Sequence, residues 1–400
     1  MKKFLVSVLL IFAMAVFVVP AALAAEADFH IGIMTATLSQ AEDAIRGAED
    51  LIARYGDVEN GGMIQHITFP DNFTSEVETT ISQLVGLADD PKMKAIVTVQ
   101  CPEGTTEAFR RIREKRPDIL LISGSPLEDP GVINSIADLC VDVDRVGFSY
   151  LRVAAVKRMG ADAFVHVSFP RHMSMEVIAR AQAILREACK DLGLAFHAET
   201  APDPTSDVGV AGTQQYVLEK MPAWIDKYGK NAAFTTTNLA HEEPMIRRIV
   251  DLDAGYWAFS ETPSMIKGFP AALNVDLSAE KGDWDAILAK LDQAARDKGV
   301  TGRLGTWKYS MVYMHALGLG EHAKRVVEGT SKIGRTKDIL EAYEMFTPGL
   351  KWNISDYIDS AKGMKLRNFY MVWQTPIILG QEGVLDLSDI EVPEKIFEIK

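Results

Sequence analysis

Cysteine is scarce in this chain, which has only three in 400 residues. They are Cys101, Cys140 and Cys189, and no two of them form a CxxC pair. An odd number of cysteines cannot make a fully paired disulfide framework. Cys140 lies in an apolar run and Cys189 on the face of a predicted helix, so we expect buried, unreactive thiols.

The familiar catalytic motifs are also missing. The sequence has no GxSxG elbow, no HExxH, no GxxxxGK[ST] and no GxGxxG that follows a strand. The His-Glu-Glu run at 241–243 lacks the second histidine that a zinc-binding helix needs. These absences disfavour an enzyme, and we expect no metal and no cofactor. Active sites built from carboxylates leave no local signature, so a hydrolase using Asp142, Glu199 and Glu261 stays open as an alternative.

The first 24 residues have the pattern of a secretory signal peptide. Lys2 and Lys3 precede the apolar run 4–19, and Pro20 separates that run from the small-residue site at 22–24. The run is marginal for a bilayer span, which needs about 20 residues. We therefore predict export to the periplasm or beyond, with cleavage near Ala24. The alternative is an uncleaved N-terminal anchor.

The chain has fewer basic than acidic residues. Lysine and arginine number 42 against 55 acidic residues, which gives a net charge of −13, and cleavage of the signal removes two more lysines. Proteins that bind nucleic acids carry basic patches, so this balance argues against a nucleic acid partner and against an acidic membrane surface. The mature chain of about 376 residues exceeds the size of a single core, which favours two domains.

A strand, a polar turn and a helix follow the signal, over residues 28–55. Buried-strand residues up to Ile33 lead into a turn with Thr35, Thr37, Ser39 and Gln40, and helical spacing begins after it. In an open α/β sheet, ligands bind outside the carboxyl ends of the strands. This turn is therefore a candidate for ligand contact.

The same unit recurs along the chain in two series. The strands predicted for the first series are 64–69, 94–99, 119–123 and 136–143, and those for the second are 163–169, 194–200, 232–237, 256–260 and 271–276. Strands that alternate with helices imply parallel sheets. The predicted fold is therefore α/β, with two doubly wound, Rossmann-like parallel-sheet lobes joined by a multi-strand hinge.

The two predicted lobes are built from three segments of the mature chain. The N-terminal lobe takes residues 25–144 and about 277–400, and the C-terminal lobe takes 145–276. Residues 284–298, 308–328 and 337–345 are predicted helices, and 369–379 is apolar and extended. These elements are too few for a third sheet, so we expect them to return to the first lobe.

In layout, the chain resembles a type I periplasmic substrate-binding protein. The resemblance is carried by the signal, by the strand and turn HIGIM-TATLSQ at the mature N-terminus and by the two successive doubly wound lobes. It is closest to poorly characterised bacterial members and more distant to basic membrane lipoproteins that bind nucleosides, whose lipobox cysteine is absent here. The resemblance implies a ligand gripped between two lobes and delivered to an ABC permease of the inner membrane.

If the strand ends of both lobes line one cleft, hydroxyl, amide and charged side chains there are candidate ligand contacts. They suit a small polar molecule such as a sugar, a nucleoside or a small carboxylate, because each buried ligand group needs a partner. The candidates are Thr35, Thr37, Ser39, Gln40, Asn72, Gln100, Ser125, Arg171, His172, Thr236, Asn238, Glu261 and Asp276.

Several of these candidates have purely structural alternatives. Thr37 or Ser39 would then cap the first helix, and Asn72 would be a turn residue. Arg171 would bind a ligand carboxylate or sugar hydroxyls, or form a salt bridge at the domain edge. His172 would lie at the surface or support the contact residues from behind. For the whole protein, a sensory adaptor that presents ligand to a membrane kinase or chemoreceptor is the alternative to an import receptor.

Overall fold

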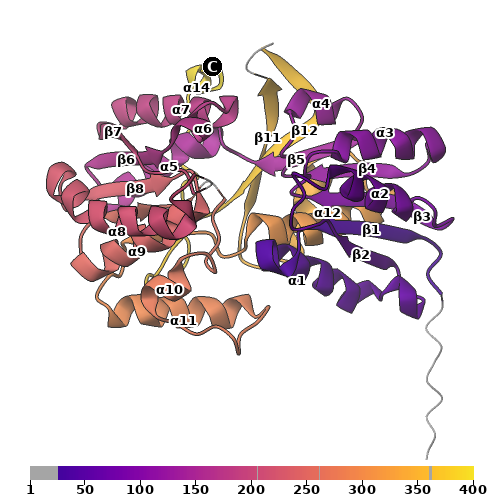
Figure 1. Ribbon diagram of the computed structural model, residues 1–400, viewed down its shortest axis with the longest axis horizontal. Helices are drawn as coiled ribbons and strands as arrows, with labels where there is room; N and C mark the ends of the chain where they lie inside the picture. The colour runs from indigo at the N-terminus through magenta and orange to yellow at the C-terminus, as the bar shows by residue number, and fades with distance from the viewer. Residues whose placement is uncertain (1–25, 205, 261, 360–362) are drawn as a thin grey trace, which may run out of the picture.

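Figure 1 shows two α/β lobes side by side, in a computed structural model that describes residues 26–204, 206–260, 262–359 and 363–400. The side chain of Ser39 and the predicted signal peptide lie outside the described part. Each lobe is built around its own sheet, and the sheets have seven and six strands. The predicted α/β fold with two doubly wound lobes is confirmed.

The first sheet has the order β11-β12-β5-β4-β3-β1-β2. Its neighbouring strands are parallel except for the antiparallel pair β11 and β12. The strands are β1 His30–Thr35, β2 Ile64–Thr68, β3 Met93–Val99, β4 Leu120–Gly124, β5 Leu139–Val143, β11 Trp352–Asp359 and β12 Met364–Gln374. The apolar side chains of the inner strands β1 and β3 are buried on both faces, as a sheet covered by helices requires, whereas the outer strands β2 and β11 are only partly buried.

Helices from both ends of the chain cover this sheet. α1 runs alongside α12, which lies on β1, β3 and β4, while α2 packs against α3. The helices of this lobe are α1 Leu38–Tyr55, α2 Val77–Leu87, α3 Thr105–Lys115, α4 Pro130–Asn134, α12 Met311–Val327 and α13 Thr336–Glu344, with a short 3-10 helix at Val58–Asn60. α1 is kinked at Ala41, so its main part begins at Glu42.

The second sheet has the order β13-β10-β9-β8-β6-β7 and is parallel except for β13. Its strands are β6 Ala163–Ser168, β7 Ala195–Thr200, β8 Ala232–Thr236, β9 Tyr256–Ala258, β10 Leu304–Thr306 and β13 Ile377–Ile378. Its helices are α5 Gly147–Met159, α6 Pro170–Met173, α7 Glu176–Leu192, α8 Gly209–Tyr228, α9 Leu239–Leu252, α10 Phe269–Leu273, α11 Trp284–Asp297 and α14 Glu394–Phe397.

The predicted strand at 271–276 is wrong. Gly268, with a φ of 75°, and Pro270 start the short helix α10 there, and Asn274 ends it in the left-handed region. The strand that the sheet uses instead is β10, more than 25 residues later. We had expected the chain from about residue 277 onward to return to the first lobe. Instead, α11 packs against α10, and residues 304–306 and 377–378 belong to the second sheet.

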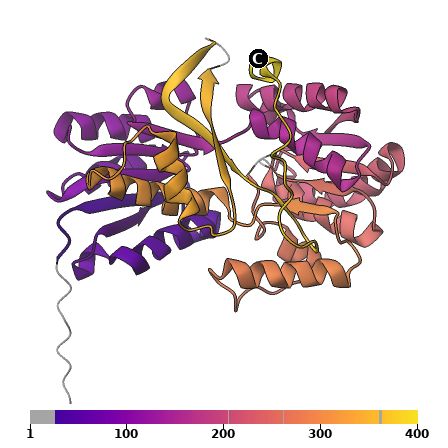
Figure 2. The same cartoon turned by 180° about the vertical axis from the view of Figure 1, so that it is seen from behind.

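Three segments connect the lobes, at 144–146, 307–310 and 375–376. Figure 2 shows the last of them from behind, where the yellow chain leaves β12 for the second lobe. Four aromatic side chains gather at these segments, and we call them the junction cluster: Phe148, Phe259, Trp307 and Trp373. The ring centroid of Phe148 lies 5.1 Å from that of Trp307, 5.8 Å from that of Trp373 and 5.9 Å from that of Phe259.

Polar side chains fix the connecting segments as well. The buried Gln374 amide donates to the Tyr309 carbonyl at 2.7 Å and accepts from the Tyr309 N–H at 3.2 Å. Two of the segments are thereby joined directly. At the third, the buried Asp144 carboxylate accepts from the N–H groups of Val146 and Gly147 at the start of α5. Burial raises the pKa of Asp144, although these hydrogen bonds favour its charged form.

The three cysteines are free and buried, as expected. Burial is the main cause that raises the pKa of each thiol, to about 12 for Cys140 and Cys189. The Sγ atom of Cys101 lies 2.9 Å from the Ser123 hydroxyl oxygen. Thiols that stay protonated inside a core do not react readily.

Acid is expected to destabilise the first lobe through His315. This side chain of α12 is fully buried, its Nδ1 lies 2.7 Å from the Tyr343 hydroxyl, and burial lowers its pKa from 6.5 to about 3. A lowered histidine pKa gives stability that is complete above about pH 6.5 and is lost as the pH falls toward 3. At pH 5 the loss from this residue is about 2 kcal/mol.

Urea unfolding of the wild type and of His315→Gln at pH 7 and pH 5 tests this expectation. The free energy of unfolding should fall less with acid in the variant than in the wild type. Equal pH dependence in both proteins would contradict a neutral, buried His315.

Candidate functional site

Three strand ends turn through the left-handed region at residues other than glycine. They are Gln100 after β3 and Ser125 after β4 in the first lobe, and Phe259 after β9 in the second, with φ values of 55°, 50° and 61°. Such conformations cost about 1–3 kcal/mol each and concentrate at functional sites. The predicted edge for ligand contact is therefore strained in both lobes.

Gln100 and Ser125 are also the predicted first-lobe contacts with unmet hydrogen-bonding capacity. Among the described residues, Gln100 Oε1 and Ser125 Oγ are buried and have no hydrogen-bond partner. Their main-chain N–H groups donate at 2.8 Å to the carbonyls of Gly124 and Val141, which ties both turns to the sheet. Buried polar atoms without partners are costly, so these two side chains stay candidates for ligand contact, although neither lines the cavity described below.

The other first-lobe candidates pair within the lobe. Thr35 is buried and its hydroxyl lies 2.9 Å from His66 Nε2. The hydroxyl of Thr37 donates to the Asp71 carboxylate and does not cap α1, and Gln40 Nε2 donates at 2.5 Å to the Asp71 carbonyl. Asn72 is an exposed turn residue whose carbonyl accepts from the next residues along the chain.

The second-lobe candidates likewise have partners of their own. Arg171 forks onto the Asp203 carboxylate with distances of 2.6 Å and 2.9 Å, so the salt bridge is the contact that the structure contains. The ring of His172 packs at a tilt against Phe169, and its Nδ1 lies 3.1 Å from the Thr237 hydroxyl. The remaining two are Thr236, 2.8 Å from His241 Nδ1, and Asn238, which caps α9 by accepting from the Ala240 N–H.

For two predicted contacts, the structure shows no position at the end of a strand. Asp276 lies in the exposed loop after α10, where its carboxylate accepts from the Ser278 N–H at 2.9 Å, so its placement at the end of a strand is wrong. Glu261 lies outside the described residues, as does the side chain of Ser39. Strand-end position alone therefore selected side chains that mostly pair with other residues of their own lobe.

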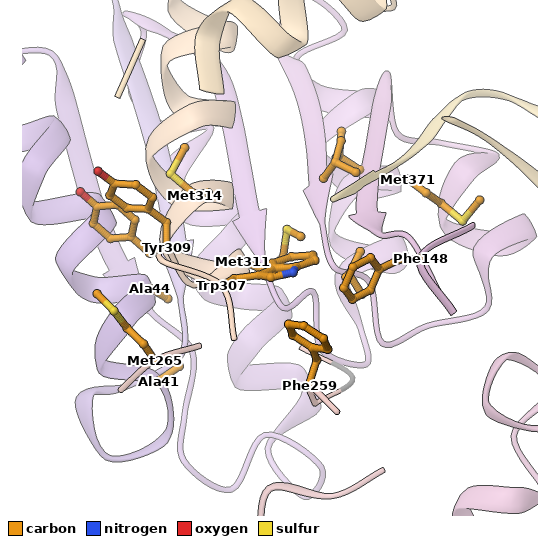
Figure 3. Close-up of a cluster of buried hydrophobic side chains, with 14 of the residues drawn as sticks. Ala41, Ala44, Phe148, Phe259, Met265, Trp307, Tyr309, Met311, Met314 and Met371 are labelled. Carbon is orange, nitrogen blue, oxygen red and sulfur yellow. The ribbon is translucent and has the colours of Figure 1, made fainter. Parts of the chain in front are cut away.

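The lobes touch each other near the start of α1. The Ser264 hydroxyl of the second lobe donates at 3.1 Å to Oδ2 of Asp43, a fully buried carboxylate on α1. Lys267 Nζ lies 3.8 Å from the other carboxylate oxygen. In Figure 3, Met265 lies beside Ala41 and Ala44 of α1, so this contact also has an apolar part.

A cavity of about 240 Å³ opens beside this contact. The first lobe lines it with α1, and the second lobe with α10, the start of α11 and the loops around them. The ring of Trp284, which lines the cavity at the start of α11, packs against the rings of Tyr309 and Tyr313, with centroids 5.7 Å and 4.8 Å away. This cavity is the candidate site, because both lobes form its walls.

Sequence reasoning missed the residues that form this contact. Asp43 lies within an amphipathic helix and reads as part of its solvated face, while Ser264 and Lys267 lie in a long loop beyond a three-residue strand. The kink of α1 at Ala41, two residues before Asp43, is visible in the structure and not in the sequence. Among the described residues, no helix has the length and apolarity needed to cross a membrane.

The two lobes, their parallel sheets and the three connecting segments define a protein with the type I periplasmic-binding-protein-like fold. A crystal structure of a proposed transcriptional regulator from Clostridium difficile 630 is similar with a TM-score of 0.76 at 23% identity, over 88% of this chain and 99% of that one. A sugar ABC transporter from Actinomyces odontolyticus ATCC 17982 is similar with a TM-score of 0.52 at 8% identity, over 77% and 86%. At these identities the likeness shows the fold alone.

The chain belongs to the family described as "Protein of unknown function (DUF3798)", which matches residues 29–305. A second family model matches residues 316–399. An uncharacterized protein from Treponema pallidum (strain Nichols) is 42% identical over 179 residues, which are 44% of this chain and 81% of that protein.

Proposed function

We propose that the protein is an exported solute receptor that captures a small organic molecule between its lobes and delivers it to an ABC transporter. The observation that carries this proposal is the cavity that both lobes line, in a fold whose lobes are joined by three connecting segments. Similarity in fold to sugar ABC transporter proteins supports a solute-binding role. Sugars, nucleosides and small carboxylates are the ligand classes to test.

The surroundings of the acidic residues that we considered for catalysis favour a receptor over a hydrolase. Asp142 is paired with Arg145 at 2.6 Å. Glu199 lies 3.0 Å from Lys227 Nζ and accepts from the Tyr228 hydroxyl, and its pKa is lowered although burial alone would raise it. A carboxylate held in its charged form by a neighbouring lysine is a poor general acid.

Ligand binding to the mature protein, residues 25–400, tests the proposal. D-galactose, inosine and hexanoate represent the three ligand classes, and calorimetry and thermal unfolding are the measurements. We expect one of the three classes to bind, and a ligand at 100 times its Kd stabilises the folded protein by about 2.7 kcal/mol. Turnover of the bound molecule would contradict a receptor, as would no binding in any class.

A further inference from the structure

The wall that the second lobe gives to the interlobe cavity is mostly apolar. It consists of Ile266, Pro270, Leu277 and Ile287, together with Trp284. A sugar carries hydroxyl groups around its whole ring, and each one buried against such a wall would lose a hydrogen bond to water without gaining another. The wall therefore suits a ligand whose body is apolar.

The charges of the first-lobe wall are already matched. Arg46 Nη2 lies 3.0 Å from Glu42, and its Nη1 lies 2.5 Å from Glu49. Asp43 accepts from Ser264 and has Lys267 at 3.8 Å. Each of these charges therefore has an opposite charge within 4 Å, whereas Oδ1 of Asp43 is buried and has no hydrogen-bond partner among the described residues.

Lys281 is different from the other charged residues of the cavity. It lies on the loop that leads into α11, it is exposed, and within the described part of the chain its ammonium has no hydrogen bond and no ion pair. An ammonium group beside an apolar wall is complementary to a ligand that carries a negative charge on an apolar body. A carboxylate is the common small anion that accepts such charge-assisted hydrogen bonds.

We propose that the interlobe cavity binds a small carboxylate with an apolar body, whose carboxylate pairs with Lys281 and whose body packs on Leu277 and Ile287. This inference rests on the proposed receptor function and narrows its ligand class. The volume of about 240 Å³ limits the ligand to a compact molecule, since pockets for drug-sized ligands begin near 300 Å³.

Calorimetry on the mature protein with hexanoate, hexan-1-ol and D-galactose tests the ligand class. Hexanoate should bind, hexan-1-ol should bind at least about tenfold more weakly because it lacks the charge, and galactose should not bind. Binding of galactose without binding of hexanoate would overturn this inference and leave the receptor function intact. No binding by any of the three, nor by inosine, would overturn both.

Two variants test the cavity itself, each with a control on α11. Lys281→Gln should weaken hexanoate binding about tenfold or more and leave hexan-1-ol binding unchanged, whereas Lys298→Gln, at the exposed far end of α11, should change neither. Leu277→Asn should weaken both ligands, whereas Leu288→Asn, half-buried outside the cavity wall, should weaken neither.

The thermal midpoints of all four variants show whether each protein is folded. Hexanoate binding that is equally strong in wild type, Lys281→Gln and Leu277→Asn would place the ligand elsewhere and overturn the inference.

Discussion

Replacing Phe148 by alanine is expected to lower the free energy of unfolding by about 3–5 kcal/mol. Phe148 is fully buried and contacts the other three rings of the junction cluster. The loss combines the transfer free energy of the ring with the cavity left behind, and edge-to-face contacts add about 0.5–1.5 kcal/mol each. Because the cluster joins all three connecting segments, both lobes should become less stable together.

Urea unfolding followed by far-ultraviolet circular dichroism measures this effect. Phe148→Leu is the control: it keeps most of the buried carbon and should cost about 1.5 kcal/mol or less. A loss below about 1 kcal/mol for Phe148→Ala would contradict a packed junction between the lobes.

The second large effect is expected from Gln374→Ala. This change leaves the buried N–H and carbonyl of Tyr309 without the amide that pairs with both. Each unpaired buried group costs about 1–3 kcal/mol, so the free energy of unfolding should fall by about 2–5 kcal/mol. The same urea titration measures the loss.

Gln381→Ala is the matched control, because Gln381 is exposed seven residues further along the chain. It should change stability by about 0.5 kcal/mol or less. If the two variants were equally stable, the Gln374 amide would not join the connecting segments in solution.

The sequence predicted the fold well where strands are long and strongly apolar. The expected ranges 94–99 and 163–169 differ from β3 and β6 by one residue at a single end. Prediction failed where an element is short. β10 has only three residues, too few for any periodic pattern, and the apolar run 271–276 reads equally well as strand or helix.

The candidate site was predicted less well, because side-chain pairing is not local. Arg171 and Asp203 are 32 residues apart, and Thr37 and Asp71 are 34 apart, so no pattern near either residue reveals its partner. The cavity between the lobes depends on contacts such as Ser264 to Asp43, which span 221 residues. Only the relative placement of the two lobes brings such groups together.

The central claim is that the two lobes close on a ligand held between them, and a distance measurement tests it most directly. Leu127 of the first lobe and Val208 of the second are exposed and follow strand ends, whereas the three native cysteines are buried. Spin labels on Leu127→Cys and Val208→Cys therefore report the separation of the lobes. The account predicts a shorter, narrower distance distribution with saturating hexanoate. A distribution unchanged by hexanoate, D-galactose and inosine would contradict it.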